Sequence, residues 1–379
     1  MFFDWLGIEQ TFDKPLPLLD GNAYIRIVVE QGEVVQDNGV ASPAYSHKGS
    51  HCDSVLIRSS GHRLVMSGNA SRWGRLENLF GFGRVDQCVY KFNEILREVY
   101  GQFDFVPQFT KCTKVFYEDG SAMKHIGADG AIIKELHITK NFTVGSENEK
   151  PYIAGISTLP YRNSIPNLYT NGFACDWKSK KGNSSLVYPT VYCKANELEL
   201  HSLPKVIKQF GSESKEAEHL QQVIDYCWAV GLVRYELKLR SRYLQRQGMQ
   251  YWGLSDYSPL ESLMEEFTSL DKKLSVTAMN FETISQQLFS AGVVDSTRAA
   301  NTTALYALGW MHGETFDFSK SQTKTHRARL RKIGIDIARP CNISKFSPVK
   351  MVSAIEVVRQ ECLPPVWYQM PKLQLRVVA

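Results

Sequence analysis

A tyrosine and a lysine with the potential for phosphate chemistry lie in the segment LVYPTVYCK, residues 186–194. The alternation of this segment predicts a β-strand, with Tyr188, Thr190 and Tyr192 on one face. Pro189 cannot donate to a β-ladder, so we expect the strand at a sheet edge or beside a bulge. Lys194, two residues beyond Tyr192, can lie on the same face as the tyrosine.

A phenol attacks a phosphodiester poorly, because its ordinary pKa is about 10. A neighbouring ammonium such as Lys194, or a metal ion that holds the phosphate, would favour the phenolate and offset the charge that builds on the phosphoryl oxygens. The pair therefore suits a tyrosine nucleophile, Tyr192, assisted by Lys194. The alternative is a packed strand tyrosine beside a surface lysine, and this segment taken alone favours that alternative.

A second group with chemical potential lies in AIIKELHITKNFTV, residues 131–144, whose pattern predicts a central strand buried on both faces. Glu135 and His137 project from the same side of it, roughly 7 Å apart along the chain. Burial of both groups is costly unless they pair with other groups or hold a metal. Either they are metal ligands, or Glu135 pairs with a lysine and His137 is hydrogen-bonded in the core.

A third group lies in GLVRYELKLRSRYL, residues 231–244, which alternates most regularly of all the segments. Its valine, tyrosine and leucines predict a buried face, and the opposite face carries Arg234, Glu236, Lys238 and Arg240. One carboxylate among several cations suits a DNA phosphate chain that also meets a metal ligand. The alternative is an ordinary solvated strand face.

The glycine-rich segment SGNASRWGRLENLFGFGR, residues 67–84, combines arginines, including Arg72 and Arg75, with aromatic residues. Glycine allows the backbone to approach a ligand closely, and arginines and aromatics hold phosphates and stack on bases. A DNA contact and a structural turn are equally good interpretations of this segment.

Composition sets the limits on these interpretations. The chain has 379 residues, of which 22% are charged and 43% hydrophobic, and a net charge of +5, which permits a polyanionic partner without demanding one. Its eight cysteines form no CxxC pair, which indicates reduced thiols and no structural zinc. The sequence predicts neither a signal peptide nor a membrane span, so we expect a cytoplasmic protein.

The remaining patterns predict the elements that must position these groups. Strands are expected at 2–8 and 24–30, a hairpin at 54–58 and 63–67, and helices at 85–99 and 213–230. Beyond about residue 246 the patterns are helical, with serine–proline starts at 258–259 and 347–348. We therefore expect an α+β fold: an antiparallel sheet with helices on one face over residues 1–245, and a helical region over residues 246–379.

Two expected helices, 297–311 and 321–333, form a helix-turn-helix-like unit whose second helix is basic. The candidate DNA contacts on that helix are Lys324, Arg327, Arg329 and Arg331. The alternative is a basic amphipathic helix that faces solvent.

With these residues assembled, the chain resembles the replication initiators of filamentous phages, the gene II class and above all its CTX-phage branch. The similarity extends over the whole chain, through FDWLGI, SGNASRWGRLENLFGFG, IKELHIT, VYCKANELELH, VIDYCWAVGLVRYELKLRSRYL and LRKIGIDI. The family's attacking tyrosine falls in a V-x-Y-x-K context, which corresponds to Val191, Tyr192 and Lys194. Related rolling-circle nucleases bind metal through a His-hydrophobic-His strand, and here the first position is Glu135, so His137 is the safer ligand.

The resemblance implies a nickase that opens one strand of double-stranded phage origin DNA and starts rolling-circle replication. Tyr192 would form a 5′-phosphotyrosine link, while Mg²⁺ or Mn²⁺ is held by His137, Glu236 and, with less support, Glu135. The implied partners are duplex and single-stranded DNA and the host replication helicase and polymerase, with a possible homo-oligomer on the origin, in the host bacterial cytoplasm. Two rivals remain open: a DNA-binding regulator without chemistry, and a metal-dependent nuclease that hydrolyses with water.

Overall fold

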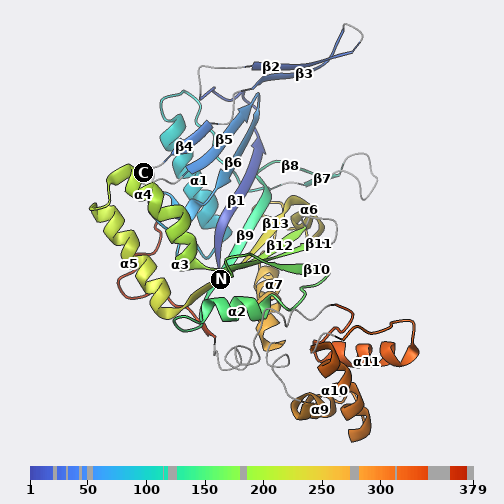
Figure 1. The fold of residues 1–379 in the computed structure, drawn as a ribbon. Helices are drawn as coiled ribbons and strands as arrows, with labels where there is room; N and C mark the ends of the chain where they lie inside the picture. The colour runs from blue at the N-terminus through green and yellow to red at the C-terminus, as the bar shows by residue number, and fades with distance from the viewer. Residues whose placement is uncertain are drawn as a thin grey trace.

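The computed structural model describes the chain except for residues 20–23, 31–32, 42–44, 49–53, 114, 118–125, 180–185, 274–280, 312–313, 340–358 and 374–379. Its fold is α+β, as the sequence predicts, with one large antiparallel sheet and a group of helices near the C-terminus (Figure 1). The serine–proline start expected at 347–348 lies outside the described residues.

Twelve strands of the described chain form the large sheet. Their order is β10 (Ser164–Leu168), β11 (Ala174–Ser179), β12 (Val187–Cys193), β13 (Leu232–Arg240), β9 (Ile132–Thr143), β1 (Phe2–Thr11), β6 (Arg63–Gly68), β5 (Ser54–Ser60), β3 (Glu33–Ala41) and β2 (Tyr24–Glu30). In addition, β14 (Gln360–Glu361) pairs with β9 and β4 (Tyr45–Lys48) with β5, while β7 (Val115–Tyr117) and β8 (Ile126–Ala128) form a separate pair. The strands expected at 2–8, 24–30 and 131–144 and the hairpin at 54–67 are confirmed.

The register of three central strands gathers the polar side chains on one face. Residues directly opposite each other in an antiparallel ladder share a face. Tyr192 lies opposite Arg234, which lies opposite Asn141 on the next strand. Thr190, Glu236 and Thr139 form the next row, and Tyr188, Lys238 and His137 the row after that. We call this side of β12, β13 and β9 the polar face.

The opposite face of the same strands is apolar and covered by helices. Phe267 of α7 (Pro259–Thr268) packs edge-on against Trp177 and Tyr235. Tyr152 of α2 (Glu149–Ile156) hydrogen-bonds the Tyr235 hydroxyl at 2.8 Å. The predicted stripe of α1 (Val85–Tyr100), including Phe92, is buried in the same hydrophobic cluster.

Helices also fill the connection between β12 and β13: α3 (Lys194–Glu197), the π-helical turn η3 (Leu198–Ser202), α4 (Leu203–Phe210) and α5 (Lys215–Val230). The start of α5 is capped by Ser214, whose hydroxyl accepts a hydrogen bond from the Ala217 N–H. It ends at Gly231 in the left-handed region, φ +62°, where a Cβ would lie 1.9 Å from the Gly145 carbonyl oxygen. Only glycine fits there.

Two sequence expectations about these strands are wrong. The strand expected through residue 244 ends at Arg240 and continues as the helix α6 (Ser241–Arg246). The strand with Pro189 is neither an edge strand nor bulged, because β11 and β13 flank it. Instead, its ladder with β11 ends at Thr190, next to the proline that lacks an N–H.

A second, smaller core holds α9 (Phe281–Ser290), α10 (Thr297–Met311) and α11 (Ser321–Lys332), which stand apart from the sheet in Figure 1. The expected helix pair is thereby confirmed. The expected boundary at 245–246 does not separate the cores, since α7, the 3₁₀ turn η4 (Ser269–Lys273) and residues 362 and 368 pack with the sheet. None of the described helices is long and apolar enough to cross a membrane.

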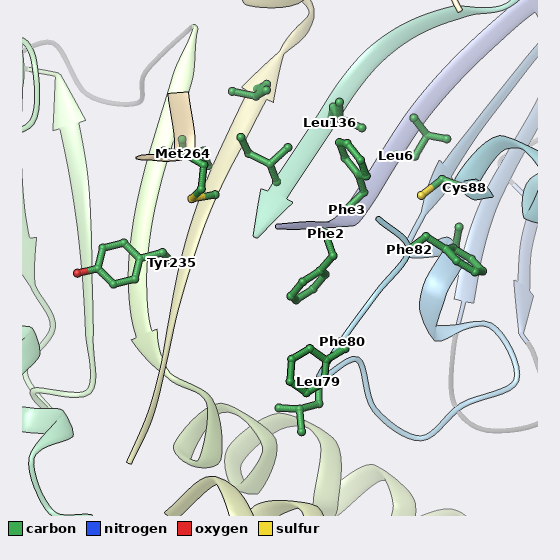
Figure 2. Packing of buried hydrophobic residues seen from close by; sticks show 14 of the residues in the cluster. Phe2, Phe3, Leu6, Leu79, Phe80, Phe82, Cys88, Leu136, Tyr235 and Met264 are labelled. Carbon is green, nitrogen blue, oxygen red and sulfur yellow. The ribbon is translucent and has the colours of Figure 1, made fainter. Parts of the chain in front are cut away.

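The glycine-rich segment forms a loop that closes the end of the sheet beside β1 and contains the 3₁₀ turn η1 (Ala70–Arg72). Figure 2 shows Leu79 and Phe80 of this loop beside Phe2. At Gly81 an added Cβ would lie 2.8 Å from the Phe2 ring and 2.9 Å from the Phe3 carbonyl oxygen. The glycine at this position therefore serves close packing against β1.

Candidate active site on the polar face

An imidazole held between two carboxylates lies at the centre of the polar face. His137 Nδ1 lies 2.9 Å from Glu236 Oε1, and Nε2 lies 3.0 Å from Glu135 Oε1. His137 and Glu236 are buried, with 8% and 6% of their surface exposed. Burial lowers the pKa of His137, but the two carboxylates outweigh it and raise the pKa overall. Burial would raise the pKa of Glu236, but the hydrogen bond and charge of His137 outweigh this effect and hold the pKa of the carboxyl well below its ordinary value.

Two cations of β13 border this triad. Lys238 Nζ lies 3.7 Å from Glu236 Oε1, and Arg240 Nη1 lies 2.6 Å from Glu135 Oε1. Their side chains are 30% and 47% exposed, so both reach the surface. On the other side, the Trp5 ring stacks on His137 with centroids 5.9 Å apart.

The triad has some of the features of a site for a divalent cation. The nitrogen and oxygen donors suit Mg²⁺ or Mn²⁺. Thr190 and Thr139 lie on either side of Glu236, and each carries a buried hydroxyl without a hydrogen-bond partner among the described residues. These hydroxyls could bind a water or an ion beside Glu236. The two carboxylates meet opposite ring nitrogens, so a cation at Nδ1 would meet His137 and Glu236 but not Glu135, and no group of three or more His, Cys, Asp or Glu gathers among the described residues. The arrangement therefore fits a cation held by two side chains, with the remaining positions open to water or phosphate.

Tyr192, the expected nucleophile, projects from β12 on the same face, diagonally across from Glu236. Burial raises the pKa of its phenol well above the ordinary value, and the charge of Glu236 adds to this effect. Arg234, directly opposite, acts in the other direction. The phenol is therefore protonated at rest, and only a local positive charge would favour its ionisation.

Arg234 does not lie on an exposed strand face, and the expectation of a surface contact with DNA there is wrong. The side chain is fully buried. Its Nε donates to Asn141 Oδ1 at 2.9 Å, and its Nη2 donates to the carbonyl oxygens of Asn78 at 2.9 Å and Leu79 at 2.7 Å. The sequence pattern failed because the loop at 69–82 covers this end of the polar face.

Lys194 is buried too, at the first position of α3. Its Nζ donates to Asn78 Oδ1 at 2.7 Å and to Glu197 Oε2 at 2.6 Å. Burial, followed by the charge of Arg234, lowers its pKa. The structure thus brings Lys194 to the Arg234 side of Tyr192, from the end of the strand.

Asp4 and Asn78 complete this end of the site, and sequence reasoning did not assign them. Asp4 lies at a register shift in β1, between Phe3 and Trp5, and such bulges redirect side chains. Its Oδ1 accepts hydrogen bonds from Asn69 at 2.6 Å and Asn78 at 2.7 Å, and its Oδ2 lies 3.5 Å from Arg234 Nη1. A lone aspartate within the apolar run FFDWLGI was the available signal for Asp4; Asn78 gave none.

Arg72 and Arg75, expected to contact DNA, are engaged within the protein. Arg72 donates to the Leu76 carbonyl at 3.2 Å. Arg75 donates to Glu77 Oε1 and to the Tyr368 hydroxyl, both at 2.7 Å. These arginines hold the loop in shape.

On α11 the predicted cations divide into two sets. Lys324 and Arg331 are exposed and Arg329 is half-buried. Arg327 is tied to Asp336 by two hydrogen bonds of 2.6 and 3.0 Å, so it stabilises the end of the helix. His326 faces the core, stacked on Tyr306 at 4.3 Å and bonded to Thr303 Oγ1.

Comparisons with known proteins show the family of this chain. Residues 1–257 match the family model of the N-terminal region of the Replication-associated protein of the gene II class, and residues 288–374 match the model of its C-terminal region. The chain is also 55% identical, over 327 residues, to the Replication-associated protein of this class from Escherichia phage If1, covering 85% of this chain and 99% of that protein. No solved structure matches.

The chain belongs to the gene II family of replication-associated proteins. The resemblance to filamentous-phage replication initiators is thereby confirmed. The N-terminal family match contains the whole polar face, and the C-terminal match contains α10 and α11. The C-terminal match also contains residues 359–373, which return to the first core.

Proposed function

We propose that this gene II family chain initiates rolling-circle replication by nicking one strand of double-stranded phage origin DNA. One observation carries the proposal: Tyr192, Glu236 and His137 project from three adjacent strands onto a single face, with a buried arginine opposite the tyrosine. A pure DNA-binding protein has no use for two carboxylates and an imidazole at the centre of a sheet, because their burial is costly.

In the proposed reaction the Tyr192 oxygen attacks the scissile phosphorus, and the bond from phosphorus to the 3′ oxygen breaks. The products are a 5′-phosphotyrosine and a free 3′-hydroxyl: the phenol loses its proton to solvent, and the leaving 3′ oxygen takes up a proton from solvent. The number of phosphoester bonds is unchanged, so the same site can reseal the displaced strand without ATP. This reversibility makes the protein a strand transferase as well as a nickase.

Arg234 supplies positive charge beside the reacting oxygen. Its Nη1 is buried 3.5 Å from Asp4 Oδ2 and has no hydrogen-bond partner in the described part of the chain, whereas its other nitrogens are held in place. A fixed donor of this kind stabilises charge that develops in a transition state without reorganisation. Asn78 accepts hydrogen bonds from both Lys194 and Arg234 and so holds the two cations next to each other.

His137 and Glu236 would hold Mg²⁺ or Mn²⁺, which when bound polarises a non-bridging phosphate oxygen. Glu135, on the opposite ring nitrogen, would orient the imidazole, as carboxylates next to metal-bound histidines do. Lys238 and Arg240 border the triad at the surface and would contact the phosphate backbone. Lys324, Arg329 and Arg331 of α11 would hold the origin duplex, the new 3′-hydroxyl would prime the host polymerase, and a host helicase would separate the strands.

Tyr192→Phe tests this proposal, because the ring stays and only the attacking oxygen is lost. With supercoiled origin DNA and Mg²⁺, we expect nicking and the covalent adduct to disappear while duplex affinity is unchanged. The stability cost is that of one hydrogen bond, about 0.5–1.5 kcal/mol.

Tyr188→Phe is the matched control, since Tyr188 lies on the same face but its hydroxyl donates a hydrogen bond to Asp176. We expect this variant to nick. Peptide mapping after nuclease digestion should place the phosphate on the peptide that contains Tyr192. Cleavage by Tyr192→Phe with a free 5′-phosphate would instead identify a hydrolytic nuclease.

A further inference from the structure

The C-terminal segment, residues 359–373, runs back along the nicking domain after the helical core. Arg359 bonds Asp271 Oδ2 at 2.9 Å and the Thr268 carbonyl at 2.9 Å, which ties the returning chain to the point where the chain left the first core. The strand β14 then pairs with the end of β9, and the Cys362 N–H donates to the Asn141 carbonyl at 3.0 Å. Asn141 is the residue whose side chain holds Arg234 Nε.

Tyr368 brings the same segment to the loop whose carbonyl oxygens bind Arg234. Its buried hydroxyl lies 3.0 Å from the Phe80 N–H, 2.7 Å from Arg75 Nη2 and 3.1 Å from Glu77 Oε2. The Tyr368 ring packs edge-on against Phe80, with centroids 5.2 Å apart. One hydroxyl therefore ties together both ends of the four-residue turn 77–80.

That turn supplies the oxygens that aim Arg234. Arg234 Nη2 binds the carbonyls of Asn78 and Leu79, which lie between the two residues held by Tyr368. Asn141 Nδ2 also donates to the Leu79 carbonyl at 2.7 Å, so the turn and the strand share one network. Figure 2 shows Leu79 and Phe80 together at the end of the sheet, next to Phe2.

We propose that Tyr368 is a positioning residue for strand nicking, and that the C-terminal segment completes the active site. Tyr368 fixes the turn 77–80, the turn fixes the Arg234 guanidinium, and the charge of the guanidinium acts on the Tyr192 oxygen. The inference rests on the proposed function. It assigns a role in nicking to a residue from the part of the chain matched by the C-terminal family model.

The test is Tyr368→Phe in the full chain, assayed in a single turnover with origin DNA at saturation. We expect the rate constant for adduct formation to fall at least tenfold, while the final amount of adduct and the affinity for duplex stay within twofold of the wild type. A purely structural role would do the reverse, because a partly unfolded sample loses amplitude and its active fraction keeps the normal rate constant.

Tyr226→Phe is the control, because the Tyr226 hydroxyl touches the same segment at Cys362 Sγ (3.6 Å) and its ring meets Trp367 rather than the turn. It should nick at the wild-type rate. Glu77→Gln is the second variant if Tyr368→Phe does not fold; it loosens the same turn and should show the same drop in rate constant.

A wild-type rate constant in Tyr368→Phe, or in Glu77→Gln where Tyr368→Phe does not fold, would overturn the positioning role. Failure of the proposed function would look different: the wild type would form no adduct, or Tyr192→Phe would cleave.

Discussion

The polar face of the sheet and the helix α11 are both rich in charge, but they hold it in opposite ways. On the polar face, Arg234 and Lys194 are fully buried and Glu236 nearly so, and each is fixed by short hydrogen bonds or ion pairs. On α11, Lys324 and Arg331 are exposed, whereas Arg327 makes a bidentate pair.

This difference predicts what each region can do. Charges buried in the low-dielectric interior interact strongly, and their hydrogen bonds hold them in place. They can therefore stabilise the charge of a transition state without moving. Exposed lysines and arginines keep their mobility and are screened by salt, so each suits a weak contact with a phosphate. Substitution of a buried charge on the polar face should therefore have a large effect, whereas substitutions on α11 should have graded effects.

The largest effect is expected at the carboxylate–imidazole triad. His137→Ala and Glu236→Gln should each lower nicking by at least about 100-fold, because each removes a proposed metal ligand. Removal of divalent metal with a chelator should do the same to the wild type, and Mg²⁺ or Mn²⁺ should restore it. Duplex affinity, measured by a band shift, should change little in both variants.

Glu135→Ala sharpens the assignment. Since Glu135 meets the outer ring nitrogen and is itself paired with Arg240, we expect the mildest loss of the three. Nicking at the wild-type rate by His137→Ala would remove that residue from the ligand set, whereas a dead Glu135→Ala would make Glu135 a direct ligand.

The sequence was sufficient for the central strands and for the face that each side chain takes. The alternation in residues 131–144 and 231–244 sets those faces, and the register then brings His137 and Glu236 together. Periodicity likewise predicted α1, α10 and α11. The sequence did not show which segment packs on each face, because alternation gives the side of the strand that a residue takes but not what covers that side.

Arg234 illustrates that limit. It alternates with apolar residues like a solvated arginine, yet a loop more than 150 positions earlier in the chain buries it completely. Pro189 illustrates another. A missing N–H predicts an interrupted ladder, but the interruption occurs inside the sheet, where β11 stops pairing, and not at its edge.

A graded effect is expected on α11. The triple change of Lys324, Arg329 and Arg331 to alanine should weaken origin binding and lower the slope of log K against log salt by about 2–3, since each phosphate contact contributes about 0.9. Nicking of a single-stranded oligonucleotide should survive, because that reaction does not require the duplex contacts.

Arg327→Ala is the contrasting change, since Arg327 is bound to Asp336. It should lower the melting temperature of the helical core rather than the salt slope. An unchanged slope in the triple variant would leave α11 as a solvent-facing helix without a DNA role.

The smallest effect concerns His326, which faces the core of the helical region rather than its charged surface. Burial, with a contribution from Arg329, lowers the pKa of its imidazole. The neutral form therefore stabilises the fold above the unfolded pKa of about 6.5, and that stability is lost as the pH falls from there towards the folded pKa.

Between pH 7.5 and 5.5 the helical core of the wild type should lose more thermal stability than that of His326→Gln. Differential scanning calorimetry follows the unfolding, and His219→Gln, at an exposed position on α5, is the control. If His326→Gln lost stability over this pH range as steeply as the wild type, the buried imidazole would not be the group that titrates.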